Sequence, residues 1–218
     1  MKKKLTDHLA IAIAVLLALS PCFLPAGERE RNPGEEKISQ ILSSVAKASS
    51  EIKTISSDFI QERQTSMLKE PLMATGRFYF ERPQRVRWEF LKPSRSGFSI
   101  NGERAKRWKD DPDQWQRFDV GKEPAIKAMT EQIFAWAGGD LAWIEKRYEI
   151  AIRSEEPLGL LLTPRAPEEK KYIRLIAISF SPDLAYVDSV EIRDREGDST
   201  RIRFIHVALN TTLPENLF

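Results

Sequence analysis

Few side chains in this sequence have the type and spacing that catalysis requires. The chain holds two histidines and one cysteine, and His206 is the histidine outside the N-terminal segment. His206 sits inside RIRFIHVAL, which has the character of a strand, and no G-x-S-x-G motif accompanies it. A Ser–His–Asp site would need His206 to meet a serine and a carboxylate in a cleft. We expect instead a strand histidine on a wet or half-buried face.

Motifs for phosphate and metal chemistry are also absent from the sequence. No G-x-G-x-x-G or G-K-[ST] loop occurs, and the lone Cys22 excludes an intramolecular disulfide and a site of several cysteine ligands. The carboxylate pairs Glu155-Glu156, Glu168-Glu169 and Asp110-Asp111 lie in charged stretches typical of solvated turns. We therefore expect a protein that is not an enzyme and that holds no cofactor and no metal.

The most distinctive stretch is a run of alternating aromatic residues between Gly76 and Ile100. Period-two alternation predicts strands with one apolar and one wet face. Pro83 and Pro93 divide the run into three strands, because proline cannot donate to a ladder. Aromatic residues dominate ordinary cores, so the pattern alone favours a filled core over a ligand cavity. The residues assigned to this face are Phe78, Phe80, Arg82, Val86, Trp88, Phe90 and Phe98.

Arg82 is the charged side chain in that set, on the same alternation as Phe78 and Phe80. A buried guanidinium needs a partner, because an unpaired charge inside a protein is costly. Arg82 could pair with a carbonyl or a carboxylate near the helices, or it could end the strand at the rim. Both interpretations stay open on sequence grounds.

The remaining elements follow the same two periods. Apolar residues at helical spacing predict an amphipathic helix over Lys37–Ser50, packed on a sheet, a second helix over Glu123–Ala137 and a short third one from Asp140 to about Lys146. Further strands are predicted at Ile52–Gln64, Arg104–Lys109, Gln114–Val120, Tyr148–Arg153, Leu158–Thr163, Ile173–Phe180, Val187–Asp194 and Thr200–Ala208. The predicted fold class is mainly β with α, as one antiparallel sheet that closes or nearly closes.

Residues 1–26 have the layout of a signal peptide. Lys2–Lys4 is basic, and the apolar run Leu9–Leu19 is too short for a stop-transfer helix. We expect export to the periplasm, a flexible leader over residues 27–36 and a single domain over residues 37–218. A lipid anchor at Cys22 is the less favoured alternative, because a proline directly precedes this cysteine.

Charge gives no indication of a nucleic-acid partner. The whole chain has 34 Lys and Arg against 32 Asp and Glu, a net charge of +2. Residues 1–26 carry three of the lysines and one aspartate, so the remainder has 31 basic and 31 acidic residues. The slight basic excess therefore comes from the targeting segment. We expect a monomer that binds no nucleic acid.

Short motifs from about Ile38 to Phe218 follow one another in an order that is more specific than any one of them. They are the opening helix, Ile55–Phe59-x-Gln61, Gly76-x-Phe78-x-Phe80-x-Arg82-Pro83, Val86-x-Trp88-x-Phe90 with Pro93, Asn101-Gly102 before Trp108, Leu162-Thr163-Pro164, Val190-x-Ile192-x-Asp194 and Thr200-x-Ile202-x-Phe204. In these motifs the chain resembles the periplasmic outer-membrane lipoprotein carriers, the LolA-like proteins. The turn Gly138-Gly139-Asp140 indicates a divergent branch.

The resemblance implies an incomplete antiparallel β-barrel, a half-barrel, with an N-terminal helix and a helical lid. It also implies acyl chains bound in an apolar concavity, with Arg82 tied to the lid and to transfer. The cavity wall would be formed by Phe78, Phe80, Val86, Trp88 and Phe90, to which we add Phe98. The lid would present Ile126, Met129, Ile133 and Trp136. By the same resemblance, an inner-membrane transporter is the donor and an outer-membrane protein the acceptor.

Two functions therefore compete. The first is a carrier that shields the acyl chains of lipoproteins, or of other envelope lipids, for transfer to the outer membrane. The alternative is a non-transport scaffold or interaction protein of the envelope that uses the same fold with a filled core. A hydrolase built on His206 comes third.

Overall fold

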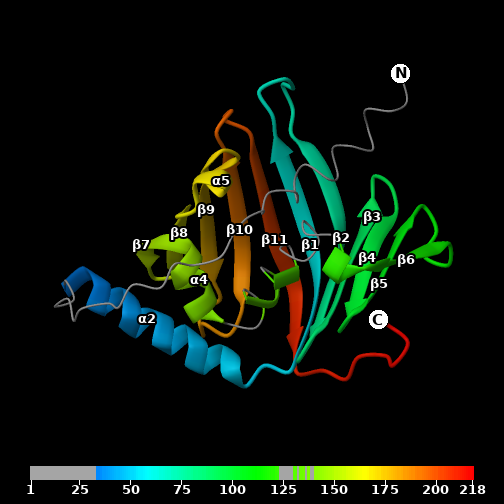
Figure 1. Cartoon of the computed structure of the whole chain (residues 1–218), viewed down its shortest axis with the longest axis horizontal. Coiled ribbons are helices and arrows are strands. Elements are labelled where there is room, and N and C mark those ends of the chain that lie inside the picture. The colour runs from blue at the N-terminus through cyan, green and yellow to red at the C-terminus, as the bar shows by residue number, and fades with distance from the viewer. Residues whose placement is uncertain (1–32, 123–129, 132, 136, 138–139) are drawn as a thin grey trace.

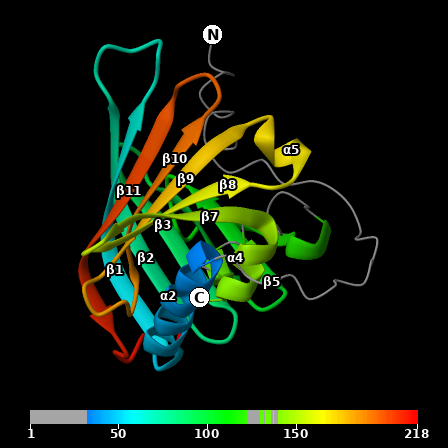
Figure 2. The same ribbon diagram turned by 90° about the vertical axis from the view of Figure 1, so that its left-hand side faces the viewer.

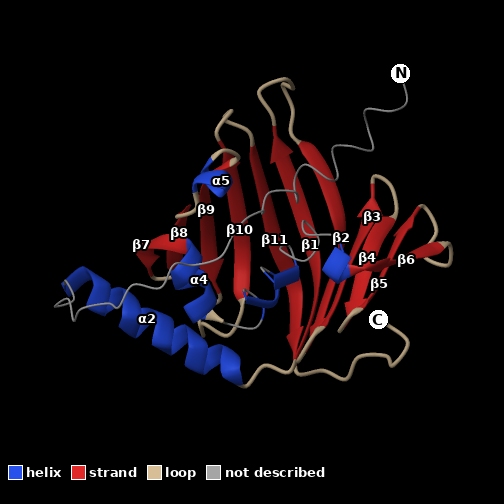
Figure 3. Ribbon diagram, in the orientation of Figure 1, coloured by secondary structure: helices blue, strands red, loops and turns tan. Residues whose placement is uncertain are grey.

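The computed structural model describes residues 33–122, 130–131, 133–135, 137 and 140–218. Within these residues, eleven strands form one antiparallel sheet in the order β6-β5-β4-β3-β2-β1-β11-β10-β9-β8-β7. The sheet is curved and open, with β6 and β7 at its edges (Figure 1). Strands dominate the molecule, and the helices are few (Figure 3). The predicted fold class is confirmed, with a sheet that does not close.

The first part of the sheet is a meander of consecutive strands. They are β1 (Thr54–Gln64), β2 (Leu72–Glu81), β3 (Arg85–Lys92), β4 (Ser96–Asn101), β5 (Arg104–Lys109) and β6 (Trp115–Asp119), followed by the 3-10 turn η1 (Val120–Lys122). The three strands expected between Gly76 and Ile100 are confirmed. Both interruptions contain the prolines that predicted them, because a proline nitrogen cannot donate to the ladder.

The second part is another meander, joined to the first by its last strand. It contains β7 (Tyr148–Glu155), β8 (Leu158–Pro164), β9 (Ile173–Phe180), β10 (Val187–Asp194) and β11 (Ser199–Leu209). β11 pairs with β1, so that Phe204 lies opposite Phe59. A register shift between Ser56 and Asp58 interrupts this pairing, and in the facing strand His206 has a φ of 54°. Such a bulge aims an extra side chain out of the regular alternation.

Three helices are described: α2 (Pro33–Ser50), α4 (Leu141–Arg147) and α5 (Pro167–Lys170). Figure 2 shows α2 and α4 on the concave side of the sheet. Asp140 caps the short helix α4 at its N-terminus, since its Oδ1 accepts a hydrogen bond of 3.0 Å from the Trp143 amide. The predicted helix over Glu123–Ala137 lies largely outside the described residues. Those of its residues that are described, 130–131, 133–135 and 137, are helical. None of the helices in the described part of the chain combines the length and apolar character needed to cross a bilayer.

Two apolar clusters divide the concave side. The first lies where α2 packs against β7, β8 and β9, as expected for the amphipathic helix. Its buried residues include Leu42, Val45, Ile144, Tyr148, Leu160, Leu162, Ile176 and Ile178. The second covers β1 to β5 and β11 and contains the aromatic run. We call the surface that carries this second cluster the aromatic face.

Candidate functional site

Strand register assembles the aromatic face from three rows of side chains across β2, β3 and β4. The first row is Phe80, Val86 and Ile100, the second is Phe78, Trp88 and Phe98, and the third is Gly76, Phe90 and Ser96. Residues two apart on a strand point to the same face, so antiparallel pairing stacks these rows side by side. The six apolar residues that the sequence assigned to the cavity wall are thus brought together on one face.

The rings of this face contact one another. The centroids of Phe59 and Trp88 are 4.6 Å apart, and Phe78 lies 5.4 Å from Trp88. Phe204 approaches Phe78 to 5.5 Å from the β11 side. These separations lie in the range of favourable edge-to-face and tilted ring pairs. We call Phe59, Phe78, Trp88, Phe90 and Phe204 the aromatic cluster.

Burial of the aromatic face is complete in the first row and partial beyond it. The first row is at most 1% exposed. In the second row Phe78 is 5% exposed, while Trp88 and Phe98 are half-buried; in the third row Gly76 and Ser96 are buried and Phe90 is half-buried. The face is therefore closed at the end near the β2–β3 turn, and its partly accessible rings are Trp88, Phe90 and Phe98.

Gly76 allows the cluster to pack against the sheet. A Cβ at this position would lie 2.4 Å from a ring carbon of Phe59 and 2.1 Å from the carbonyl oxygen of Glu89. Any side chain here would push the Phe59 ring away from β2. The glycine thus fixes how closely β1 and β2 share the aromatic face.

Arg82 directly follows β2 and is exposed. Its Nε donates a hydrogen bond of 2.7 Å to the carbonyl oxygen of Ile52, and its Nη2 donates one of 3.2 Å to that of Ser49. The structure thus combines the two interpretations of this arginine, a carbonyl partner near a helix and a place at the strand end. These contacts join the end of β2 to the end of α2.

Lid residues are described in part. Ile133 packs against the aromatic face, as does Phe134, whose ring centroid lies 6.1 Å from that of Phe80. Ile126, Met129 and Trp136 lie outside the described residues. The lid role of Ile133 stays a prediction.

One buried polar group lies among these apolar side chains. Ser57 is 4% exposed and shares the inward alternation of β1 with Phe59. Its hydroxyl oxygen has no hydrogen-bond partner among the described residues. A buried hydroxyl without a partner is costly, so a ligand oxygen beside Ser57 would gain a hydrogen bond.

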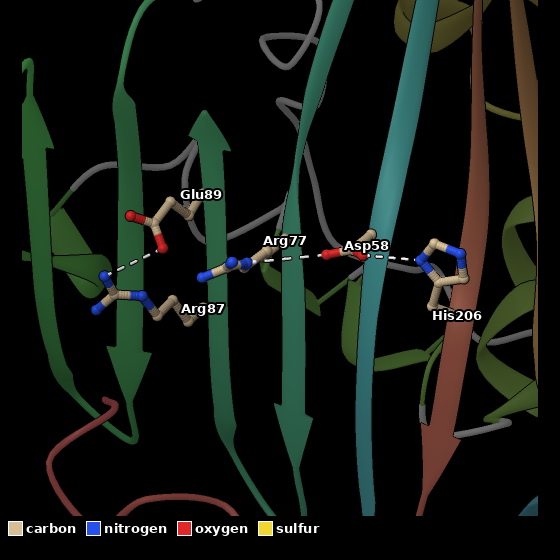
Figure 4. Close-up of polar contacts among 5 residues, drawn as sticks. All are labelled: Asp58, Arg77, Arg87, Glu89 and His206. Atoms are coloured by element: carbon tan, nitrogen blue, oxygen red, sulfur yellow. Dashed lines mark hydrogen bonds and ion pairs between the residues drawn. The ribbon is translucent and has the colours of Figure 1, made fainter. Parts of the chain in front are cut away.

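A row of polar residues lies on the opposite, convex face (Figure 4). Asp58 contacts His206 through an Oδ2–Nδ1 distance of 3.0 Å and Arg77 through an Oδ1–Nε distance of 3.8 Å. On β3, which neighbours the strand of Arg77, the Nη2 atom of Arg87 lies 3.4 Å from Oε2 of Glu89. The His206 side chain is 77% exposed. The strand histidine that the sequence predicts on a wet or half-buried face is therefore exposed, beside a carboxylate on a convex surface.

Sequence reasoning missed three aromatic contributors. Phe59 and Phe204 come from the paired strands β1 and β11, and Phe134 comes from the segment above the sheet. Phe59 alternates with polar residues in the sequence, which predicts a strand. Only the pairing of β1 with β2 and β11 shows that the Phe59 ring lies against Trp88. No local signal marks such a pairing.

Fold and site together define a half-barrel protein whose concave side carries an apolar, aromatic surface. A model of the family described as outer membrane lipoprotein carrier protein LolA matches residues 50–218. The chain therefore belongs to the LolA family, as its motifs indicate.

Relatives agree with this assignment. An outer-membrane lipoprotein carrier protein of Methylococcus capsulatus is 27% identical over 168 residues, which cover 76% of each chain. One of Ralstonia nicotianae is 25% identical over 186 residues, covering 78% of this chain and 77% of the relative. The crystal structure of MucB shares the fold with a TM-score of 0.51 at 15% identity. That match covers 84% of this chain and 62% of MucB, so the chain spans less than two thirds of the length of MucB.

Proposed function

We propose that this protein is a periplasmic carrier that shields the acyl chains of lipoproteins, or of another envelope lipid, on its aromatic face. The observation that carries the proposal is the aromatic face itself, on which the rings of Trp88, Phe90 and Phe98 are only half-buried. Such a surface can cover an acyl chain from one side while leaving a path for access. Membership of the LolA family supports the same function, with acyl-chain binding in place of catalysis.

Affinity would come from burial of the acyl chain. Each methylene moved from water to an apolar surface contributes about 0.8 kcal/mol. Trp88, Phe90 and Phe98 are half-buried, so a chain laid over them would remove both its own surface and theirs from water. Polar groups of the cargo could accept a hydrogen bond from Ser57, whose hydroxyl is buried beneath.

Binding would require rearrangement of the cluster and of its cover. The ring centroids of Phe59, Phe78, Trp88 and Phe204 already lie 4.6 to 5.5 Å apart in pairs. A bound acyl chain must therefore replace some of these ring contacts. Ile133 and Phe134 must move away from the face, and Ile126, Met129 and Trp136 complete the proposed lid. Cargo then favours the open state because it binds that state better.

Partners follow from the same proposal. An inner-membrane transporter would load the carrier, and an outer-membrane protein would accept the cargo. Residues 1–26 would direct export, and Arg82 would link occupancy of the face to the position of the lid.

Titration with a fluorescent fatty acid tests the function. We expect saturable binding by the wild type and at least about tenfold weaker binding by Trp88→Gln, since loss of roughly 1.4 kcal/mol is tenfold. Trp115→Gln makes the same chemical change at an exposed tryptophan on β6 and should bind like the wild type. Folded wild type that shows no saturable binding would refute the proposal.

A scaffold with a filled core is the second candidate, and the mutual ring contacts of the aromatic cluster favour it. It predicts that no lipid co-purifies from native membranes and that neither tryptophan variant changes any lipid measurement. Mass spectrometry of extracts from the purified protein separates the two functions.

A further inference from the structure

Large hydrophobic side chains that remain exposed gather in a few turns of the described chain. Across the described residues, the exposed ones are Met67 (91%), Leu68 (44%), Leu72 (53%), Met73 (52%), Trp115 (39%) and Tyr172 (56%). Met67, Leu68, Leu72 and Met73 belong to the β1–β2 hairpin. Single exposed apolar residues are ordinary, but a group at one place marks an interaction site.

All six residues lie at the same end of the sheet. In an antiparallel sheet alternate turns share an end, and here the turns β1–β2, β3–β4, β5–β6, β8–β9 and β10–β11 do so. Trp115 begins β6 opposite Trp108, and Tyr172 directly precedes β9. Figure 1 shows the β1–β2 hairpin, the β10–β11 turn and α5 together at the top. We call this edge of the molecule the tip end.

The β1–β2 hairpin presents apolar side chains on both of its faces. Leu72 and Met73 are neighbours on a strand and therefore point in opposite directions, yet both are half exposed. A groove on a partner protein would cover one face, whereas a lipid layer surrounds an inserted hairpin. The hairpin is also anchored, because the Ser66 amide donates a hydrogen bond of 2.9 Å to Asp198 Oδ1 in the β10–β11 turn.

Charges of both signs occur in the turns of the tip end. Lys69 is followed by Glu70, Glu168-Glu169 by Lys170-Lys171, and the basic Lys92 and Arg95 of the β3–β4 turn are balanced by Asp110, Asp111 and Asp113 of the β5–β6 turn. This mixture gives no strong field of one sign, so attraction would depend on apolar burial. Tryptophan and tyrosine, as at Trp115 and Tyr172, are the side chains favoured at the boundary between headgroups and acyl chains.

The tip end lies beyond the third row of the aromatic face. Leu72 shares the alternation of Gly76, Phe78 and Phe80 on β2, and four residues of strand separate it from Gly76 by about 13 Å. Gly76 lies in the third row, which also contains the half-buried Phe90. A surface in contact with Leu72 would thus lie next to the row of the proposed acyl site that contains Phe90.

We propose that the tip end docks on the surface of a phospholipid bilayer, with the β1–β2 hairpin inserted at headgroup depth. This is a second binding surface, for intact membrane rather than for a carried lipid. Docking on the bilayer does not depend on the proposed carrier function. Only the use of the docked state to load or deliver cargo rests on that function.

Vesicle flotation tests the docking. Purified protein is mixed with vesicles of phosphatidylethanolamine and phosphatidylglycerol, and the wild type should float with them. The combined variant Met67→Ser, Leu68→Ser, Leu72→Ser and Met73→Ser should lose roughly tenfold or more in partitioning while binding fatty acid as before. Partitioning of the wild type should change little with salt, because the tip end carries charges of both signs and no large excess of either. Equal flotation of wild type and variant would overturn the proposal, as would flotation abolished by salt.

A site-specific probe locates the contact. The chain has one cysteine, so Met67→Cys or Glu103→Cys in a Cys22→Ser background carries a single environment-sensitive fluorophore. Glu103 is exposed in the β4–β5 turn at the opposite end of the sheet. Vesicles should shift the emission of the probe at position 67 to shorter wavelength and leave the probe at 103 unchanged. A shift at both positions, or a shift at 67 caused by concentrated protein without vesicles, would refute membrane docking, the latter in favour of self-association.

Discussion

Gly76 shows how one residue sets the geometry of the aromatic face. We expect Gly76→Ala to lower the free energy of unfolding by about 1–3 kcal/mol, because the added methyl must displace the Phe59 ring or the β3 backbone. Urea unfolding measures the change. Gly34→Ala is the control, since a Cβ there meets nothing within 4 Å, and it should be neutral or slightly stabilising. A Gly76→Ala protein as stable as the wild type would show that the face is loosely packed.

At the same scale, period-two alternation predicted which side chains share the aromatic face. It placed Phe78, Phe80 and Val86 on one apolar face, and these three are buried, because burial on one side of a strand leaves a local trace in the sequence. It could not separate these residues from the half-buried Trp88 and Phe90, since exposure depends on what lies above the sheet. Arg82 shows a second limit: the strand ends before it, so the alternation no longer assigns it a face.

Among the elements, β2 and α2 are tied together at their ends by Arg82. We expect Arg82→Met to lower the free energy of unfolding by about 1–2 kcal/mol and to speed amide exchange near Ile52, because two carbonyl oxygens lose a charged donor. Arg77→Met makes the same chemical change within β2, but it removes only a partly exposed ion pair with an N–O distance of 3.8 Å, so its effect should be small. Equal effects of the two substitutions would contradict a special role for Arg82.

Element boundaries were predictable within a few residues, and element partners were not. Turn signals and prolines marked the ends of β2, β3 and β4 because both act locally. The sequence predicts a charged turn where the one-turn helix α5 forms, since four residues carry no helical period. The pairing of β1 with β11 joins distant parts of the chain, and it carries no signal in either strand alone.

For the whole molecule, two buried glutamates should shape stability in opposite ways. Burial of Glu191 opposes its charge, but hydrogen bonds from Arg201 and Arg193 outweigh this and hold its pKa below the usual value. Burial raises the pKa of Glu169 despite the neighbouring Arg147. The lowered pKa of Glu191 stabilises the fold at neutral pH, and this stabilisation is lost as the pH falls through that pKa. The raised pKa of Glu169 gives a stabilisation that is present at acidic pH and is lost as the pH rises through that pKa.

Comparison of unfolding free energies at several pH values tests this. The advantage of the wild type over Glu191→Gln should grow as pH rises from acidic to neutral, reaching about 1–3 kcal/mol. The difference in free energy of unfolding between the wild type and Glu169→Gln should instead shrink as pH rises. This change should begin at a higher pH than the change for Glu191→Gln. The same slope for both variants would show that the two carboxylates do not titrate as described.

An open sheet leaves the molecule with two edge strands, and exposed edges are sites where chains aggregate by pairing. β6 is short and carries Arg117 and Asp119, both exposed. On β7, Glu149 and Arg153 are exposed, and Glu155 is bridged at 2.5 Å by Lys37 from α2. Charged side chains on both edges disfavour the addition of another strand. The open half-barrel is thereby protected at both edges without closing its sheet.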